Sequence, residues 1–418
     1  MSEASGPPAP PAHDPYVALR IPNFRRFIAS SLAMTLAAQL QGTVVAWQVY
    51  AITRDPLSLG LIGLAEALPF IGVALFAGHV ADRLDRRRIA LAALAALLAC
   101  SLALLALTVR PLEGHAQLVA MYGVIVVSGV ARSFLQPARV ALGAELVPRE
   151  QYANAITWRT STWQLAAVLG PALGGVLYGF AGPAVAYVAD VVLMGVALAC
   201  MGAVRVAPRA LAPAAESVFE SLSSGVRFVR GQPVLLGALT LDLFSVLFGG
   251  AVALLPVFAG EILRVGPQGL GLLRAAPAAG AVVMSLLMAH RPPLQRAGRA
   301  LLWAVALFGL AMIGFGLSRH FWLSVGLLAF SGMADTVSVV IRSTLLQLLT
   351  PEQLLGRVSS VNSIFIGSSN EIGAFESGVA ARLLGTVASV VLGGVATLGV
   401  VAATAARVPE LRRLRTIA

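Results

Sequence analysis

Long apolar segments, separated by short charged ones, constrain this chain more than any other feature. A helix needs about 20 apolar residues to cross the hydrocarbon core of a bilayer, and most of these segments reach that length. They are rich in Ala, Leu, Gly and Val and lack strand-like alternation, which favours helices over a β-barrel. Charged residues make up 12% of the chain, whereas a soluble domain carries about 25%. The sequence therefore predicts an all-α polytopic membrane protein and excludes a soluble enzyme.

About twelve transmembrane helices are expected from the lengths of the apolar segments and the Pro, Gly and charged residues between them. The approximate spans are 27–52, 58–81, 89–109, 116–138, 153–181, 183–203, 233–260, 267–290, 299–317, 321–344, 358–382 and 384–406. We expect five regions: a Pro-rich disordered leader (1–20), a six-helix bundle (21–203), a cytoplasmic linker with an amphipathic surface helix (204–232), a second six-helix bundle (233–406) and a cytoplasmic tail (407–418).

The basic residues predict the orientation of the chain. All 30 of them are Arg, and with the N-terminus placed in the cytoplasm 22 fall in inside segments and five in outside segments. Cytoplasmic loops of membrane proteins carry the excess of basic residues, so both termini are expected on the cytoplasmic side. This orientation accounts for most of the net charge of +11 without any binding to nucleic acid.

The two halves of the chain resemble each other. Gly63, Pro69 and Gly72 match Gly271, Pro277 and Gly280 at a constant offset of 208 residues. The string RVALGAELVPREQ after the fourth span likewise resembles RSTLLQLLTPEQ after the tenth. Six spans repeated in the same orientation predict a pseudo-twofold axis along the membrane normal, with the substrate site between the halves near mid-membrane.

A charged loop follows the second span. Its sequence GHVADRLDRRR resembles the loop signature G-x-x-x-D-R-x-G-R-R of the major facilitator superfamily, although Asp85 replaces the usual Gly. Together with the 6+6 layout, the resemblance implies the major facilitator fold. It also implies that this loop gates conformational change rather than binding substrate. The residues concerned are Gly78, Asp82, Arg83, Arg86 and Arg87.

A second motif lies in the fifth span, where LGPALGGVLYG contains Gly170, Pro171, Gly174 and Gly175. Small residues at this spacing permit close helix approach. The string resembles the G-P-x-x-G-G antiporter motif of exporters in the superfamily. Further strings, among them LLQLLTPEQLLGRVSSVNS, resemble the enterobactin-exporter-like branch, from about residue 20 to the C-terminus. This resemblance implies a bacterial inner-membrane exporter, without implying enterobactin as its substrate.

Ionisable residues at membrane depth cost at least about 2.5–3.5 kcal/mol, so each is a functional candidate. The candidates for substrate binding or proton coupling are Glu66, Arg132, Arg159, Asp242, Arg274, Asp335, Glu371 and Glu376. Glu66 and Arg274 occupy repeat-equivalent positions, and we expect them to face each other across the central cavity. Glu371 and Asp242 are the first candidates to carry a coupling proton. The alternative is interhelical ion pairing for packing alone, which is favoured for Asp335 and for Asp190.

Polar and aromatic side chains within the spans are candidates to line a cavity: Gln39, Trp47, Trp163, Gln164 and Asn370. The alternative for the Trp residues is anchoring at the membrane interface. Cys100 and Cys200 lie in apolar segments and the five His are scattered, so neither a metal nor another cofactor is expected.

The leading hypothesis is a monomeric secondary active exporter of a siderophore-like or drug-like small molecule, working by alternating access in exchange for protons. The chain has no Lys and therefore no G-x-x-x-x-G-K-[ST] phosphate-binding loop, which excludes ATP hydrolysis by this route. An uptake or facilitated-diffusion carrier of the same fold and a non-transporting membrane sensor remain as alternatives. A membrane-embedded enzyme is disfavoured because no His, Asp or Glu cluster has catalytic spacing.

Overall fold

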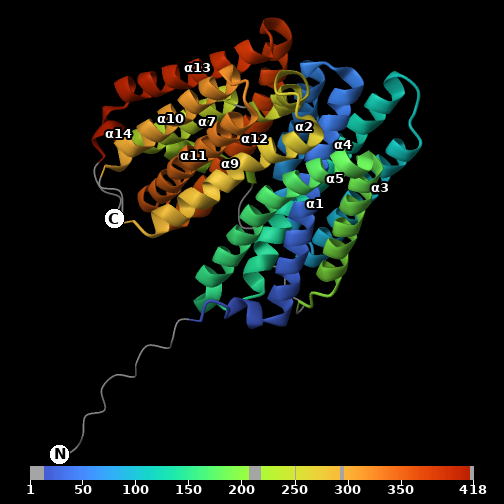
Figure 1. Ribbon diagram of the computed structural model, residues 1–418. Coiled ribbons are helices and arrows are strands. Elements are labelled where there is room, and N and C mark those ends of the chain that lie inside the picture. The colour runs from blue at the N-terminus through green and yellow to red at the C-terminus, as the bar shows by residue number, and fades with distance from the viewer. Residues whose placement is uncertain (1–13, 207–217, 250, 292–295, 415–418) are drawn as a thin grey trace, which may run out of the picture.

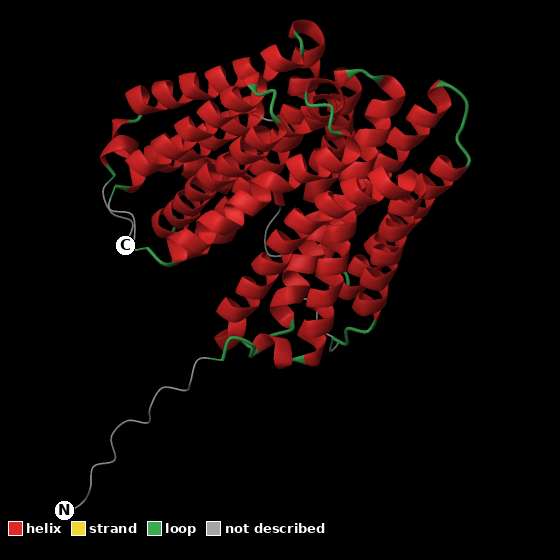
Figure 2. Ribbon diagram, in the orientation of Figure 1, coloured by secondary structure: helices red, strands yellow, loops and turns green. Residues whose placement is uncertain are grey.

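The computed structural model describes residues 14–206, 218–249, 251–291 and 296–414. These residues form helices joined by short turns, and no strand occurs among them (Figures 1 and 2). Nine helices in the described part of the chain are long and apolar enough to cross a membrane. The predicted all-α membrane class is thereby confirmed, while the count of twelve spans stays a prediction.

Long helices of the first half pack against one another as the N-terminal bundle. Its elements are η1 (Ala18–Arg20), α1 (Pro22–Thr53), α2 (Pro56–Arg83), α3 (Arg86–Val109), α4 (His115–Glu145), η2 (Arg149–Gln151) and α5 (Tyr152–Gly202). α5 spans two of the expected helices, and its backbone breaks at Gly182, where φ is 83° and ψ is 171°. Glycine adopts this positive φ without steric cost, and Pro183 cannot continue the preceding helix.

The second half forms the C-terminal bundle, which is joined to the first by the linker helix α6 (Val218–Arg230). Its elements are α7 (Pro233–Gly249), η3 (Ala251–Leu254), α8 (Leu255–Val257), the π-helical turn η4 (Phe258–Ile262), α9 (Gly266–Ala289), α10 (Ala297–Leu317), α11 (Phe321–Leu349), α12 (Glu352–Leu384), α13 (Thr386–Arg407) and α14 (Pro409–Arg413). The single helix expected over 233–260 is instead divided, because Pro256 has no N–H to continue the helical hydrogen bonds. Most of the expected leader and part of the expected linker, 207–217, lie outside the described residues.

Two pairs of helices make most of the contact between the bundles: α2 with α12, and α5 with α9. The bundles form a V in Figure 1, joined on one side and diverging toward the two chain termini. At the joined side, which we call the closed end, Arg382 Nη1 lies 3.2 Å from Asp55 Oδ2. The Tyr50 hydroxyl there donates to Glu261 Oε1 at 2.7 Å. A charged contact, a hydrogen bond and tight helix packing thus hold the bundles together at the closed end.

Candidate functional site

Four charged side chains gather where the two bundles meet, and we call them the charge cluster. Arg132 on α4 and Glu66 on α2 form an ion pair, with Nη1 to Oε1 at 3.3 Å. Both side chains are half-buried, and together with Glu371 on α12 they line a small cavity of about 110 Å³. The cavity therefore has charged walls from both bundles.

Arg274 on α9 completes the charge cluster. Its Nη1 donates to the backbone carbonyl of Gly42 on α1 at 3.0 Å, which ties α9 to the N-terminal bundle. The charges of Glu66 and Glu371 both act on this guanidinium. Each bundle thus contributes one acid and one base, and the cluster has no net charge when all four groups are ionised. Glu66 and Arg274 lie in one cluster, but the direct partner of Glu66 is Arg132.

Small residues bring the helices of the charge cluster together. A Cβ added at Gly129 of α4 would lie 2.7 Å from Pro69 Cγ, and one added at Gly63 of α2 would lie 2.8 Å from the carbonyl oxygen of Glu371. Both positions therefore require glycine for α2 to approach α4 and α12 this closely. Gly63 and Pro69 belong to the internal repeat, so the repeat positions also set the packing around the site.

A second group of charges is buried inside the C-terminal bundle. Arg342 on α11 forms an ion pair with Asp242 on α7, with side-chain exposures of 7% and 8%. The charges of Asp242 and Arg342 also act on Asp335, which precedes Arg342 by about two turns of α11. Asp242, a candidate for proton coupling, is therefore engaged within its own bundle rather than at the contact between bundles.

Asp190 on α5 is fully buried in the N-terminal bundle. Its Oδ2 accepts a hydrogen bond from Gln41 Nε2 at 2.8 Å, and the same nitrogen donates to Ser101 Oγ at 3.2 Å. These contacts link α1, α3 and α5. No three His, Cys, Asp or Glu side chains in the described part of the chain gather in a way that could hold a metal ion.

The remaining candidate residues lie at separate places. Arg159 and Trp163 line a different cavity, in the N-terminal bundle, next to half-buried Gln164. Trp47 lies at the closed end, 5.8 Å from the Tyr50 ring by centroids, and packs on the apolar core of the C-terminal bundle. Gln39 on α1 faces Gly170 of α5. The side chain of Asn370 is exposed and donates a hydrogen bond to the backbone carbonyl of Ile366. Glu376 is half-buried on α12.

The charged loop after α2 is described in part. Gly78, Asp82 and Arg83 belong to the backbone of α2, and the surroundings of these three residues lie outside the described part of the structure. Asp85, which replaces the family's Gly, caps α3 by accepting hydrogen bonds from two backbone N–H groups of its first turn. Such a cap stabilises a helix by about 1 kcal/mol.

Two arginines of the same loop tie it to neighbouring helices of the N-terminal bundle. Arg86 forms an ion pair with Glu145 at the end of α4. Arg87 Nη2 donates to the Gly202 carbonyl at the end of α5, at 2.7 Å. The loop therefore fixes the ends of α3, α4 and α5 to one another at the end of the bundle that carries the N-terminus.

The glycine motif of α5 makes close contacts in two directions. A Cβ added at Gly170 would lie 2.5 Å from Gln39 Cβ, and one at Gly174 would lie 2.9 Å from the Leu40 carbonyl oxygen, both on α1. A Cβ at Gly175 would lie 2.4 Å from the Pro267 carbonyl oxygen, and one at Gly271 of α9 would lie 2.6 Å from the Pro171 carbonyl oxygen. The motif thus packs α5 on its own bundle and on the opposite bundle at once.

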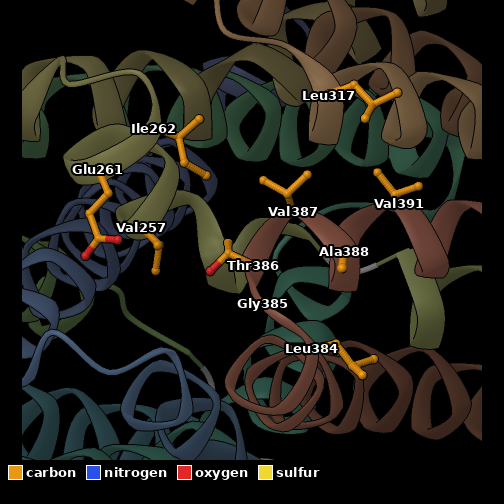
Figure 3. Close-up of a pocket in the computed structure, with 10 residues that line it drawn as sticks. All are labelled: Val257, Glu261, Ile262, Leu317, Leu384, Gly385, Thr386, Val387, Ala388 and Val391. Atoms are coloured by element: carbon orange, nitrogen blue, oxygen red, sulfur yellow. The ribbon is translucent and has the colours of Figure 1, made fainter.

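A larger cavity of about 580 Å³ lies in the C-terminal bundle near the closed end. Figure 3 shows Val387 and Val391 at the start of α13 pointing toward Leu317 of α10. Its one carboxylate, Glu261, already accepts a hydrogen bond from Tyr50. The apolar lining contrasts with the charged groups of the cluster, so the cluster remains the stronger candidate for the functional site.

Comparison of the sequence with known proteins places it among transporters. Residues 13–417 match the family described as transmembrane secretion effector. The enterobactin exporter EntS of Shigella flexneri is 27% identical over 398 residues, which cover 94% of this chain and 93% of that protein. The enterobactin exporter EntS of Citrobacter koseri is 28% identical over 395 residues, covering 94% of each chain.

Solved structures share the fold at low sequence identity. A POT family transporter in complex with 5-aminolevulinic acid superimposes with a TM-score of 0.73 at 11% identity, covering 93% of this chain and 96% of that one. A bacterial homologue of the iron transporter ferroportin in its inward-facing state gives 0.67 at 17% identity, covering 92% and 99%. These likenesses show the fold of a major facilitator transporter.

Proposed function

The chain belongs to the transmembrane secretion effector family of the major facilitator superfamily, and from this premise we propose that it exports a small molecule by alternating access in exchange for protons. The observation that carries the proposal is the charge cluster at the contact between the bundles. Groups from both bundles meet there, so any movement of one bundle against the other changes their mutual distances. Protonation of one carboxyl group changes the same interactions, which couples proton binding to bundle movement.

Glu371 is the proposed proton carrier of the cluster. Its neighbours are the acid Glu66 and the bases Arg132 and Arg274. When the bundles separate, Glu371 moves relative to the charges of the N-terminal bundle, and its preference for the proton changes. A proton taken up in one state of the transporter is thus released in the other. Asp242 serves a structural role in this proposal, because its partner Arg342 lies in the same bundle.

The proposed orientation, with both termini in the cytoplasm, rests on the arginine distribution. The proposed location in the bacterial inner membrane rests on the relatives. In this orientation the closed end faces the outside, and the diverging ends of the bundles face the cytoplasm. The glycine contact between α5 and α9 and the pair Asp55–Arg382 then close the outer side, and both separate in the outward-open state. An exporter loads its substrate from the cytoplasm in such an inward-facing state.

The substrate class follows from the relatives that are named enterobactin exporters, which makes a siderophore the first compound to test and drug-like compounds the second. Inside-out membrane vesicles from cells that produce this protein carry out the test. Energised vesicles should accumulate the exported compound, and a protonophore should abolish the accumulation. Equilibration without dependence on the gradient would mean facilitated diffusion, and no movement of any compound would favour a sensor.

Variants of the chain test the coupling. E371Q should abolish accumulation driven by a proton gradient while it preserves exchange of labelled for unlabelled compound, because a neutral side chain can still pass through both states. E150Q, at an exposed site on η2, is the matched control and should accumulate the compound as the wild type does. Full proton-driven accumulation by E371Q would refute the assigned carrier.

A further inference from the structure

The cavity lined by Arg159 and Trp163 lies wholly within the N-terminal bundle, and we call it the arginine cavity. Its volume is about 320 Å³, and α1, α4 and α5 line it through Ser31, Arg139, Arg159 and Trp163, among others. Small-molecule sites span roughly 300–1,000 Å³, so the arginine cavity has room for a small organic group. Hydroxyl groups and two guanidinium groups make its polar wall.

The positive charges of the arginine cavity are not compensated within the described part of the chain. Arg139 lies opposite another base, and the charge that acts on it is that of Arg159. Its hydrogen-bond partners are weak: Gln136 Oε1 at 3.4 Å and Met34 Sδ at 3.7 Å. Arg159 has neither an ion pair nor a hydrogen bond with any described residue. Both side chains are partly buried at the same cavity, where like charges repel each other, and a bound anion relieves that repulsion.

Two further side chains complete a site for an organic anion. The hydroxyl of Ser31 is buried and has no hydrogen-bond partner, although its residue lines the cavity. A buried hydroxyl without a partner is rare in folded proteins, and a ligand oxygen would satisfy it. Trp163 is 53% exposed at the same cavity, so its ring offers an apolar face beside the two guanidinium groups.

We propose that the arginine cavity binds an aromatic organic anion, with its acidic group between Arg139 and Arg159 and its ring against Trp163. Arginine guanidinium groups suit carboxylates because they donate paired, charge-assisted hydrogen bonds. The cavity therefore prefers a planar carboxylate to a neutral molecule of the same shape.

The place of the cavity gives it a role that rests on the proposed export function. Arg139 follows Arg132 of the charge cluster by seven residues on α4, roughly 10 Å at 1.5 Å per residue. Trp163 precedes Gly175, where α5 contacts α9, by twelve residues, roughly 18 Å. The cavity thus lies on the diverging side of the bundles, and it forms the first binding position for an anionic substrate on its way to the charge cluster.

Binding of 1-naphthoate to the purified protein in uncharged lipid nanodiscs tests the proposal, with neutral 1-naphthamide as the matched probe and calorimetry as the readout. Naphthoate should bind at least tenfold more tightly than naphthamide. R139Q and R159Q should each weaken naphthoate binding at least tenfold, while R159K should keep part of it. The matched control R149Q removes an exposed charge near the start of α5 and should bind as the wild type does.

Equal binding of the two probes, or no binding of either, would overturn the proposal, as would wild-type affinity in both R139Q and R159Q. If R139Q fails to fold, the affinity of R159Q for naphthoate still tests the proposal, because replacing Arg159 removes no ion pair or hydrogen bond with a described residue. The assay needs no ion gradient, so its outcome is independent of transport. Naphthoate binding by a protein that transports nothing would support the anion site and refute the proposed export function. Proton-driven export that neither substitution affects would support the export function and refute the role of the cavity in it.

Discussion

The buried pair Asp242–Arg342 gives a prediction whose size follows from its surroundings. Both side chains are nearly inaccessible, and Arg342 Nε has no hydrogen-bond partner, so Asp242 supplies most of the compensation for the guanidinium charge. Removal of one partner from a buried ion pair costs about 3–5 kcal/mol, because the other charge stays buried without compensation. Because Asp335 lies near this pair, loss of Arg342 and loss of Asp242 should lower the free energy of unfolding by different amounts.

R342Q leaves two acids, Asp242 and Asp335, near each other without a base, so it should lower the free energy of unfolding by about 5 kcal/mol, the upper end of that range. D242N leaves Arg342 with Asp335 as a substitute partner, and its loss should be about 3 kcal/mol. The double variant D242N/R342Q removes both charges together. Its loss should fall short of the sum of the single losses by about 0.5–3 kcal/mol, the coupling found for residues in contact.

Unfolding of the purified variants in mixed micelles of dodecylmaltoside and dodecyl sulfate, followed by circular dichroism, measures these free energies. R319Q, at an exposed site of the same bundle, serves as the control and should change the free energy of unfolding by less than about 0.5 kcal/mol. Additive losses in the double variant, or a larger loss in D242N than in R342Q, would refute this reasoning about the pair.

Three further predictions follow from other contacts. G175L should weaken the contact between the bundles at the closed end, because the new side chain would overlap the backbone of α9. A cysteine placed at Trp47, in a chain without the two native cysteines, should then react faster with maleimide, and an unchanged reaction rate would contradict this. E66R and R132E should each abolish transport, whereas the charge swap E66R/R132E should restore it; a double variant as inactive as the singles would show that the pair does not act as a unit. D190A should lower the free energy of unfolding by about 1–3 kcal/mol for each hydrogen-bond donor left unpaired, and D190N by less; equal losses in a denaturation series would contradict the assigned hydrogen bonds.

Much of the fold could be predicted because a membrane helix can be recognised from the length and hydropathy of one continuous segment of sequence. Apolar length, the repeat at an offset of 208 and the two motifs led to the all-α class and the family. The break at Gly182 also fell between two expected spans. The division of 233–260 was missed because the segment is long and apolar enough for one transmembrane helix, and its Pro256 was not read as the cause of a break.

The site could be predicted only as a set of candidates. Glu66, Arg132, Arg274 and Glu371 were identified from their charge at membrane depth, but the direct pairing of Glu66 with Arg132 depends on how each helix is rotated about its axis. Helices that are apolar on all sides show little amphipathic pattern from which that rotation can be read. Arg139 was missed because it was counted among the loop arginines, whereas α4 extends to Glu145 and includes it.

A cross-link at the closed end tests the central claim, that the two bundles must separate there during transport. Cysteines at Asp55 and Arg382, whose side chains lie 3.2 Å apart, can be joined by a short reducible bifunctional reagent in a chain without Cys100 and Cys200. Energised inside-out vesicles with the cross-linked protein should accumulate none of the exported compound, and reduction should restore accumulation. Accumulation by the cross-linked protein at the rate of the uncross-linked protein would contradict alternating access at this end.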